Sequence, residues 1–348
     1  MNFSKILTNW YSDNNRDLPW RKTKNPYYIW LSEIILQQTQ VKQGLPYYES
    51  FVKKYPTVFA LANASEEEVL KLWQGLGYYS RARNLHATAK HIAFNLNGKF
   101  PDNYKGLLQL KGVGDYTASA IASIAFNKVT AVVDGNVYRV LARYFGIATP
   151  INSTEGIKEF KTLASSLISE NEPATYNQAI MEFGAIQCKP KNPDCDTCPL
   201  KESCVALQKR LTTTLPIKLK KIKVSKKYFN FLVFIDKKGQ TLFEKRTEKG
   251  IWRNLYQFPL IESKKSLDAD EFHYLDINDT KLSTMKFDYT LYNEKDIVHK
   301  LSHQHLYTKF WIIEVSELPE EAVSTDKISK YPTSVLISDF IKTFNFKV

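Results

Sequence analysis

The sequence predicts two domains, a mostly α-helical N-terminal domain followed by a smaller α+β domain. Apolar residues recur with helical spacing through most of the chain up to Cys204. A lysine-rich segment without acidic residues, 218–227, comes next. From Tyr228 onward, short apolar runs alternate with turn residues, a pattern typical of strands. At 348 residues the chain is long enough to bury two separate cores.

The bulk composition narrows the class of partner. A formal net charge of +12 favours a polyanionic partner, although a general bias toward lysine would give the same charge. The chain has no apolar run of membrane-spanning length, and residues 1–21 do not resemble a signal peptide. We therefore expect no membrane partner and a cytoplasmic location.

A predicted helix over Tyr27 to about Val41 carries the first candidate residue. Pro26 suits the start of this helix, and Glu33 lies among its apolar residues. Such a glutamate is either exposed or desolvated, and desolvation would raise its pKa until it carries a proton at neutral pH. The helix ends in an amide cluster that could contact base edges or simply face solvent: Gln37, Gln38 and Gln40.

Two further helices are predicted at Tyr47–Lys54 and Glu66–Trp73. The glycine-containing turn after them bears Tyr78 and Tyr79, followed by arginines. An aromatic ring on such a turn can wedge into a base stack while arginines hold phosphates. Core tyrosines beside surface arginines would have the same sequence.

The stretch 110–143 predicts a helix, a hairpin and two more helical segments. Gly112 and Gly114 indicate a turn too tight for residues with a Cβ, followed by a helix over Tyr116–Phe126. Exposed amides beside a helix N-terminus can bind an anion. Asp134 then follows a short apolar run where an N-cap is expected, so we expect its carboxylate to stay ionised. A structural turn and an ordinary cap are the alternatives.

All four cysteines fall in one short segment with the spacing C-x6-C-x2-C-x5-C: Cys188, Cys195, Cys198 and Cys204. Clustered cysteines in an intracellular chain favour a metal site over disulfides. Zinc sites usually have two C-x2-C pairs, whereas this segment has one. A [4Fe–4S] cluster held by four thiolates fits the spacing better.

The C-terminal part predicts an α+β domain with strands at 228–235, 240–246, 298–302 and 306–315 and a helix at 331–346. If one strand carried His299, His303 and His305, the three imidazoles would share a face. With no carboxylate or cysteine nearby in the sequence, a solvated strand edge is the simpler interpretation and a metal site the less favoured one.

These motifs together resemble the helix–hairpin–helix, iron–sulfur DNA glycosylases, and within them the adenine DNA glycosylases of the MutY type. The resemblance rests on the hairpin LKGVG, the Val133-Asp134-Gly135 step, the cysteine loop, and the segments LPW, WLSE, LQQTQV and GLGYY. The segments GIW and LYQFP add a resemblance to the Nudix-like C-terminal domain of these enzymes, without a Nudix catalytic helix pattern. The implied domains are a glycosylase over 1–215 with its cluster loop at 188–204, a basic linker at 216–227, and a lesion-recognition domain over 228–348.

The resemblance implies removal of adenine paired with 8-oxoguanine or guanine in double-stranded DNA, by a nucleoid-associated monomer. Bifunctional relatives carry a lysine where this chain has Tyr116, and a phenol cannot form their Schiff base. The sequence therefore favours a monofunctional glycosylase. The alternatives are a bifunctional glycosylase/lyase similar to endonuclease III and a non-catalytic lesion-binding or redox-sensing protein.

The resemblance also assigns roles to individual residues. Glu33 would be the general acid and Asp134 the charge-stabilising carboxylate, supported by Tyr116 and Asn136. Two groups are implied to contact DNA: Arg16, Trp20 and Gln178 around the adenine, and Gln38 and Tyr78 at the opposite base. In the recognition domain, Leu301, Ser302 and His303 stand where the family has a Phe-Ser-His loop, and the serine would distinguish 8-oxoguanine from guanine.

Overall fold

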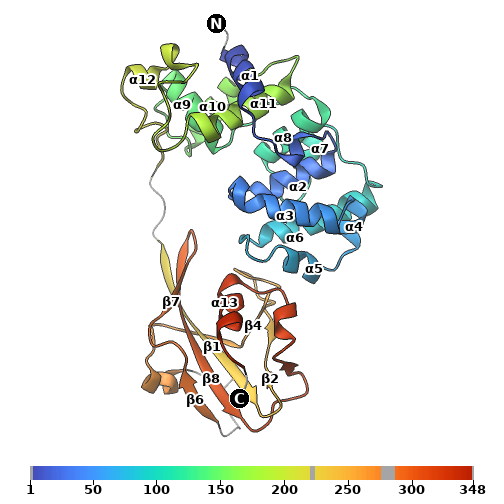
Figure 1. Ribbon diagram of the computed structural model, residues 1–348, viewed down its shortest axis with the longest axis vertical. Coiled ribbons are helices and arrows are strands. Elements are labelled where there is room, and N and C mark those ends of the chain that lie inside the picture. The colour runs from blue at the N-terminus through green and yellow to red at the C-terminus, as the bar shows by residue number, and fades with distance from the viewer. Residues whose placement is uncertain (1–2, 220–223, 276–286, 347–348) are drawn as a thin grey trace. The chain divides into compact units, whose positions relative to one another are not determined.

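The computed structural model describes residues 3–219, 224–275 and 287–346 (Figure 1). The chain forms two compact units: the first comprises Met1–Asn63 and Asn84–Lys220, and the second comprises Ala64–Arg83 and Lys221–Val348. The segment 64–83 therefore belongs with the C-terminal residues, although the sequence suggested one N-terminal domain over 1–215. Within the described ranges, no helix is both long and apolar enough to cross a membrane.

The first unit is built from helices. Their bounds are α1 Phe3–Asn14, α2 Pro26–Leu36, α3 Val41–Lys54, α4 Val58–Asn63, α6 Ser80–Lys90 (from Asn84 onward in this unit), α7 Tyr104–Leu108, α8 Asp115–Phe126, α9 Gly135–Phe145, α10 Thr154–Leu167, α11 Pro173–Glu182 and α12 Val205–Gln208. Short 3-10 turns lie at Pro19–Arg21 and Lys201–Ser203, and π-helical turns at His91–Asn95 and Phe183–Gln187. Helix α8 packs against α2, α7 and α11, and α11 also packs against α1 and α9.

Helix α2 is buried around most of its circumference. Asn25 caps it by accepting a hydrogen bond from the Tyr27 amide at 3.0 Å, and Pro26 occupies its first turn. The helix ends at Leu36, not near Val41 as the sequence suggested. Gln38 adopts a left-handed backbone with φ of 55°, which stops the helix before α3 begins.

The second unit contains a five-stranded sheet with the order β5-β1-β8-β6, in which β7 also pairs with β8. Its strands are β1 Ser225–Asp236, β5 Leu260–Ser263, β6 Asp288–Leu291, β7 Ile297–Lys300 and β8 Gln304–Val315. Strands β1 and β8 run parallel over their full length, as Figure 1 shows, and the other pairs are antiparallel. Two small ladders join β2 Gln240–Thr241 to β9 Val323–Ser324 and β3 Glu244–Lys245 to β4 Tyr256–Gln257.

Helices α5 (Glu66–Leu72) and α13 (Val335–Thr343) also belong to the second unit. Glu67 of α5 accepts hydrogen bonds from Tyr256 Oη at 2.8 Å and Lys245 Nζ at 2.9 Å. These contacts explain why a segment from the middle of the N-terminal sequence associates with the C-terminal one. Each face of the sheet is covered: Phe340 of α13 stacks on Phe310, and the 3-10 turn Ala269–Tyr274 packs Phe272 on Trp311.

Several C-terminal elements differ from the sequence prediction. The predicted strand 240–246 is split into the separate strands β2 and β3. The last helix begins at Val335, because Pro332 precedes it and Ser334 is its N-cap. Strand β7 ends at Lys300 and residues 301–303 form the turn into β8, so the three histidines do not share one strand face.

Both ends of the predicted linker 216–227 contain hydrogen-bonded residues. Ile217 accepts a hydrogen bond from the Ile151 amide at 3.0 Å, and Leu219 is held by both polar groups of the Asn152 side chain. At the other end, β1 begins at Ser225. Residues 220–223 of this segment lie outside the described residues.

Candidate active site

Glu33 lies in the last turns of α2 and is buried, with 9% of its surface exposed. Burial of the carboxyl raises its pKa to about 7, and the nearby Asp134 carboxylate acts in the same direction. A hydrogen bond from Tyr116 and the charge of Arg21 oppose this shift. The desolvated alternative for Glu33 is therefore correct, and near pH 7 a substantial fraction of this side chain carries a proton.

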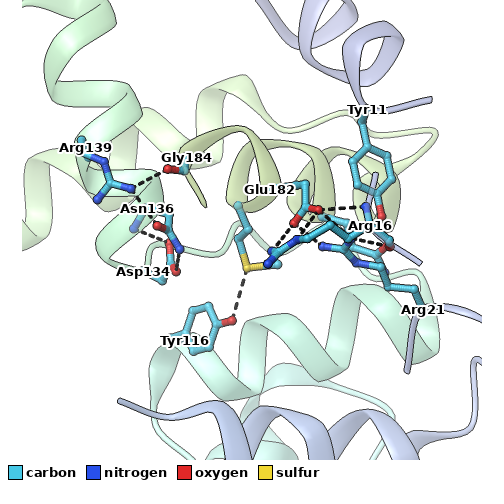
Figure 2. Close-up of polar contacts among 11 residues, drawn as sticks. Tyr11, Arg16, Arg21, Tyr116, Asp134, Asn136, Arg139, Glu182 and Gly184 are labelled. Atoms are coloured by element: carbon cyan, nitrogen blue, oxygen red, sulfur yellow. Dashed lines mark hydrogen bonds and ion pairs between the residues drawn. The ribbon is translucent and has the colours of Figure 1, made fainter. Parts of the chain in front are cut away.

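Tyr116 stands in the first turn of α8 beside Glu33, with which its hydroxyl forms a hydrogen bond. The same hydroxyl lies 3.2 Å from the Met181 sulfur, a contact drawn in Figure 2. Burial and the two nearby carboxylates raise the pKa of Tyr116 well above its ordinary value. The phenol therefore stays neutral and can donate a hydrogen bond to Glu33.

Asp134 is the N-cap of α9, as the sequence predicted. Its Oδ1 accepts hydrogen bonds from the amides of Asn136 at 2.9 Å and Val137 at 2.8 Å, and its Oδ2 accepts one from Asn136 Nδ2 at 2.8 Å. Burial raises the pKa of Asp134 more than these hydrogen bonds lower it. Burial thus opposes the cap, because α9 and its neighbours also remove the carboxyl from water.

Asn136 is fixed by a residue that the sequence did not reveal. Arg139 Nη2 donates to Asn136 Oδ1 at 2.8 Å and to the Gly184 carbonyl at 2.6 Å (Figure 2). Since the amide oxygen of Asn136 is thereby engaged, its nitrogen is directed to Asp134. The spacing of one helical turn between the two residues was the available signal for this pair.

These side chains line one cavity of about 180 Å³. The structure brings together in it the residues expected at the reacting base, which are Arg16, Trp20, Glu33, Tyr116, Asp134, Asn136 and Gln178. Trp20 is packed edge-on against Tyr48, and Gln178 Oε1 accepts a hydrogen bond from Tyr11 at 2.8 Å. The cavity thus combines a protonatable acid, a capped carboxylate and several hydrogen-bonding groups.

Glu182 and Arg21 also line this cavity and were missed from the sequence. Glu182, 1% exposed, forms ion pairs with Arg16 at 2.6 Å and Arg21 at 2.7 Å. Glu182 lies between the apolar residues Met181 and Phe183, just as Glu33 lies among apolar residues of its own helix. The same pattern in the sequence could therefore have identified Glu182. Gln38, by contrast, is not among the residues lining the cavity and is exposed.

The hairpin places its two glycines in different conformations. Gly112 has φ of 81°, and a Cβ there would lie 2.8 Å from the Asn84 Cβ, so glycine is required. Gly114 has φ of −94° and ψ of −177°, an extended backbone that any residue can adopt, so the expectation that both glycines are required by a tight turn is wrong for Gly114. Gly114 is the N-cap of α8, makes no side-chain cap and has open space where a Cβ would stand. The first amides of α8 are therefore accessible to an anion.

The four cysteines form a set of partly buried thiols without disulfides. Burial raises the pKa of Cys198 to about 11, and the other three thiols contribute to this rise, so their sulfurs lie within electrostatic reach of each other. Arg143 Nη1 lies 3.4 Å from Cys188 Sγ. In the described residues, no three His, Cys, Asp or Glu side chains converge as a single metal ion would require. Four thiols gathered in one loop are the type of ligand that a [4Fe–4S] cluster takes.

A second cavity, of about 530 Å³, lies within the second unit. It is lined by residues 75–80 and Arg83 from one segment and by Gly250–Trp252, His299–His303 and Val335 from others. Tyr78 is 47% exposed and has φ of 46°. The structure therefore brings Tyr78 together with Leu301, Ser302 and His303, which are more than 200 residues away in the sequence.

Comparisons with known proteins identify the family of this chain. Residues 31–164 match the HhH-GPD superfamily of base excision DNA repair proteins, and residues 230–343 match the NUDIX domain. An adenine DNA glycosylase of Buchnera aphidicola (subspecies Baizongia pistaciae) is 38% identical over 89% of this chain and 86% of its own length. The chain belongs to the adenine DNA glycosylase family. It is therefore a DNA glycosylase of base excision repair, and it binds DNA.

Adenine DNA glycosylases from distant organisms are also similar to this chain. The protein of Homo sapiens is 45% identical over 60% of this chain and 40% of its own length. Among solved structures, a thermostable thymine-DNA glycosylase is 32% identical with a TM-score of 0.55, covering 60% of this chain and 95% of that one. A non-covalent endonuclease III–DNA complex, 23% identical with a TM-score of 0.52, covers 60% of this chain and 94% of its own and shows the same fold.

Proposed function

We propose that this adenine DNA glycosylase hydrolyses the N-glycosidic bond of adenine paired with 8-oxoguanine or guanine. The observation that carries the proposal is the pair of carboxyl groups in one cavity, where Glu33 is protonatable near pH 7 and Asp134 accepts three hydrogen bonds. Two carboxyl groups in different environments suit the division of work between an acid and a charge stabiliser. Tyr116 has no amine, which favours hydrolysis without strand cleavage.

Glu33 would donate its proton to N7 of the flipped-out adenine as the C1′–N9 bond breaks, so the bonding electrons leave with a neutral base. Positive charge then develops on the sugar. Asp134 would stabilise that charge as an anion, or trap it transiently, because the amides of α9 fix its orientation. A water molecule positioned by Asn136 would add to C1′ and return a proton to the Glu33 carboxylate.

The remaining residues of the cavity would bind the base. Gln178 has its oxygen engaged by Tyr11, so its amide nitrogen is available to donate to adenine. Arg16 and Trp20 would border the base on the same side of the cavity as Gln178. In the hairpin, Gly112 and Gly114 would leave the amides of α8 free for a DNA phosphate.

Cys188, Cys195, Cys198 and Cys204 would hold a [4Fe–4S] cluster. When bound, the cluster would fix the loop 188–204 and take no part in the glycosidic cleavage. Arg143 supports this assignment, since it holds the start of the loop through the Lys189 carbonyl at 2.8 Å and the Cys188 sulfur.

The second unit would recognise the base opposite adenine. Tyr78 of this unit would enter the stack near this base, as would Gln38 of the first unit. The turn Leu301–His303 would contact the base, with Ser302 accepting a hydrogen bond from the protonated N7 of 8-oxoguanine. Guanine has no proton at this position. We further propose a nucleoid-associated monomer with a glycosylase part over 1–215, a linker at 216–227 and a recognition part over 228–348, to whose compact unit the segment 64–83 contributes. The net charge of +12 supports association with chromosomal DNA.

A glycosylase assay on three duplexes tests the proposal. The duplexes contain adenine opposite 8-oxoguanine, adenine opposite guanine, and thymine glycol. We expect removal of adenine from the first two, without strand cleavage until alkali is added, and loss of this activity in Glu33→Gln. Excision of thymine glycol with covalent trapping by borohydride would establish the bifunctional alternative instead. Binding without excision would establish the lesion-binding alternative.

A further inference from the structure

Glu182 is a buried carboxylate at the end of α11 that the proposed reaction leaves without a role. Arg16 donates to it from Nε at 2.7 Å, from Nη2 at 2.6 Å and from its backbone amide at 3.0 Å. Arg21 donates from Nη1 at 3.0 Å and from Nη2 at 2.7 Å. Figure 2 shows both guanidinium groups converging on this single carboxylate.

The shared carboxylate fixes the geometry of both arginines. Each guanidinium presents two parallel N–H donors to the two oxygens of Glu182, which sets the plane of each group as well as its position. The Arg21 guanidinium also donates to the Arg16 carbonyl at 3.0 Å and lies 5.5 Å from the Tyr11 ring. Because Tyr11 in turn holds Gln178, one connected network orients this side of the cavity.

Glu182 is also a permanent negative charge. Burial would raise the pKa of Glu182, but the hydrogen bonds from Arg16 and Arg21 outweigh burial and lower this pKa to about 2. The carboxylate thus stays ionised at every pH at which the enzyme would work. Two guanidinium cations and one carboxylate leave a local charge of about +1, where the arginines alone would give +2.

This charge balance matters to Glu33, which lines the same cavity. Tyr116 of α8, Asp134 at the start of α9 and Arg21 of the turn Pro19–Arg21 act on the pKa of Glu33. The cavity is also lined by the ionisable groups of Arg16 and Glu182, and α3 contributes the apolar Val41. The positive charge of Arg21 favours the ionised form of Glu33, which cannot act as an acid. Positive charge that develops on adenine and the sugar would likewise be repelled by an unscreened arginine.

We propose that Glu182 is a positioning residue for base excision, which clamps Arg16 and Arg21 in one orientation and screens their charge from Glu33 and from the reacting base. The inference rests on the proposed role of Glu33 as the general acid. This role requires a carboxylate, since a neutral side chain of the same shape would supply a hydrogen-bond acceptor but no negative charge.

The pH dependence of excision separates this role from a purely structural one. In Glu182→Gln the arginines lose their counter-charge, so Glu33 should release its proton at lower pH. We expect the alkaline decline of the single-turnover rate to move down by about one pH unit, which makes the rate about tenfold lower than in the wild type on the alkaline side. The matched control is Asp17→Asn, which removes the same charge from an exposed ion pair with Lys22 and should leave the profile unchanged.

Two further variants complete the test, with excision of adenine opposite 8-oxoguanine followed from about pH 5 to about pH 9. Glu182→Asp keeps the charge with a shorter reach, so its rate should fall while its alkaline midpoint stays that of the wild type. Arg21→Met removes the cation next to Glu33, so the alkaline midpoint of this variant should move to higher pH. The double variant with Glu182→Gln should therefore have a midpoint closer to that of the wild type than Glu182→Gln alone. Thermal unfolding of each variant identifies any that fails to fold.

A lower rate in Glu182→Gln with an unchanged midpoint would overturn the proposal and leave Glu182 a structural residue. If Glu182→Gln does not fold, the Arg21→Met variant tests the proposal instead. An unchanged alkaline midpoint of its excision rate would contradict the claim that the charge of Arg21 affects Glu33. Failure of the underlying function is distinguishable from both results. In that case the wild type itself would lack an alkaline decline, or Glu33→Gln would remain active.

Discussion

Glu33 and Glu182 are buried glutamates that line the same cavity, yet their pKa values move in opposite directions. Glu33 has a pKa raised to about 7 by burial, whereas the pKa of Glu182 is lowered to about 2 by hydrogen bonds from two arginines that outweigh its burial. The difference lies in the partners, since Glu33 meets a neutral phenol and Glu182 meets two cations. Individual partners therefore decide which carboxyl can donate a proton.

The raised pKa of Glu33 predicts a pH-dependent cost to stability. Between the ordinary pKa of 4.5 and about 7, the folded protein holds a proton that the unfolded chain has released, so the free energy of unfolding falls as pH rises. The loss is roughly 1.4 kcal/mol per pH unit, on the order of 3 kcal/mol in total. Glu33→Gln removes this pH-dependent loss. In urea unfolding, the free energy of unfolding of the variant should therefore rise relative to that of the wild type between about pH 5 and about pH 8. An equal difference at both pH values would contradict the buried, protonated state.

Asp134→Asn tests the second carboxyl at the same scale. Asparagine retains an oxygen that can accept the hydrogen bonds from the Asn136 and Val137 amides, so the cap of α9 and the melting temperature should change little. Loss of the anion should lower the single-turnover rate by about 10²- to 10³-fold. Near-normal excision by a folded variant would assign charge stabilisation to another group.

At the scale of elements, the two glycines of the hairpin before α8 are expected to have different roles, Gly112 in folding and Gly114 in DNA binding. Gly112→Ala should destabilise the protein by about 1–3 kcal/mol, because alanine is strained at a φ of 81° and its Cβ would meet Asn84. Gly114→Ala should fold normally, since its backbone is extended and its surroundings are open. Its methyl group would nevertheless stand beside the amides of α8, so DNA affinity should fall. Thermal melts and salt-dependent binding measurements on both variants check this contrast.

The cysteine loop is the second element with a testable role. Cys198→Ser should reduce the visible absorption of the purified protein and weaken DNA binding, while far-ultraviolet circular dichroism of the distant helices changes less. The reason is that the loop 188–204 contains little regular structure besides a short 3-10 turn and would depend on its four thiolate ligands. Full activity from a wild-type protein that contains neither iron nor visible absorption would contradict the cluster assignment.

At the scale of the whole molecule, recognition of the opposite base would depend on segments far apart in the chain. Tyr78 and Ser302 line one cavity because residues 64–83 belong to the second unit. Ser302→Ala should narrow the preference for 8-oxoguanine over guanine opposite adenine by about 1 kcal/mol, or roughly fivefold. Activity on adenine opposite guanine should fall much less. Competitive single-turnover assays measure this ratio, and equal losses on both duplexes would mean that the turn supports folding or general binding.

The sequence alone predicted most of the candidate residues that the structure places in one cavity, and the type of most elements. The cysteine spacing, the two hairpin glycines, the cap at Asp134 and the change of pattern near Tyr228 are local signals, because each depends on a few neighbouring residues. The same holds for the resemblance to adenine DNA glycosylases, which is carried by short continuous motifs. Helix ends were less predictable, since the left-handed backbone at Gln38 that ends α2 has no strong local signature.

Tertiary structure alone decided the electrostatics of the site and the composition of the units. The pKa of Asp134 is raised because surrounding helices bury it, against the local effect of its cap. The clamp of Glu182 on Arg16 and Arg21 joins residues about 160 positions apart, and segment 64–83 joins a unit whose other residues begin at 221. Burial and long-range pairing depend on which surfaces meet, and no local pattern in the chain specifies that.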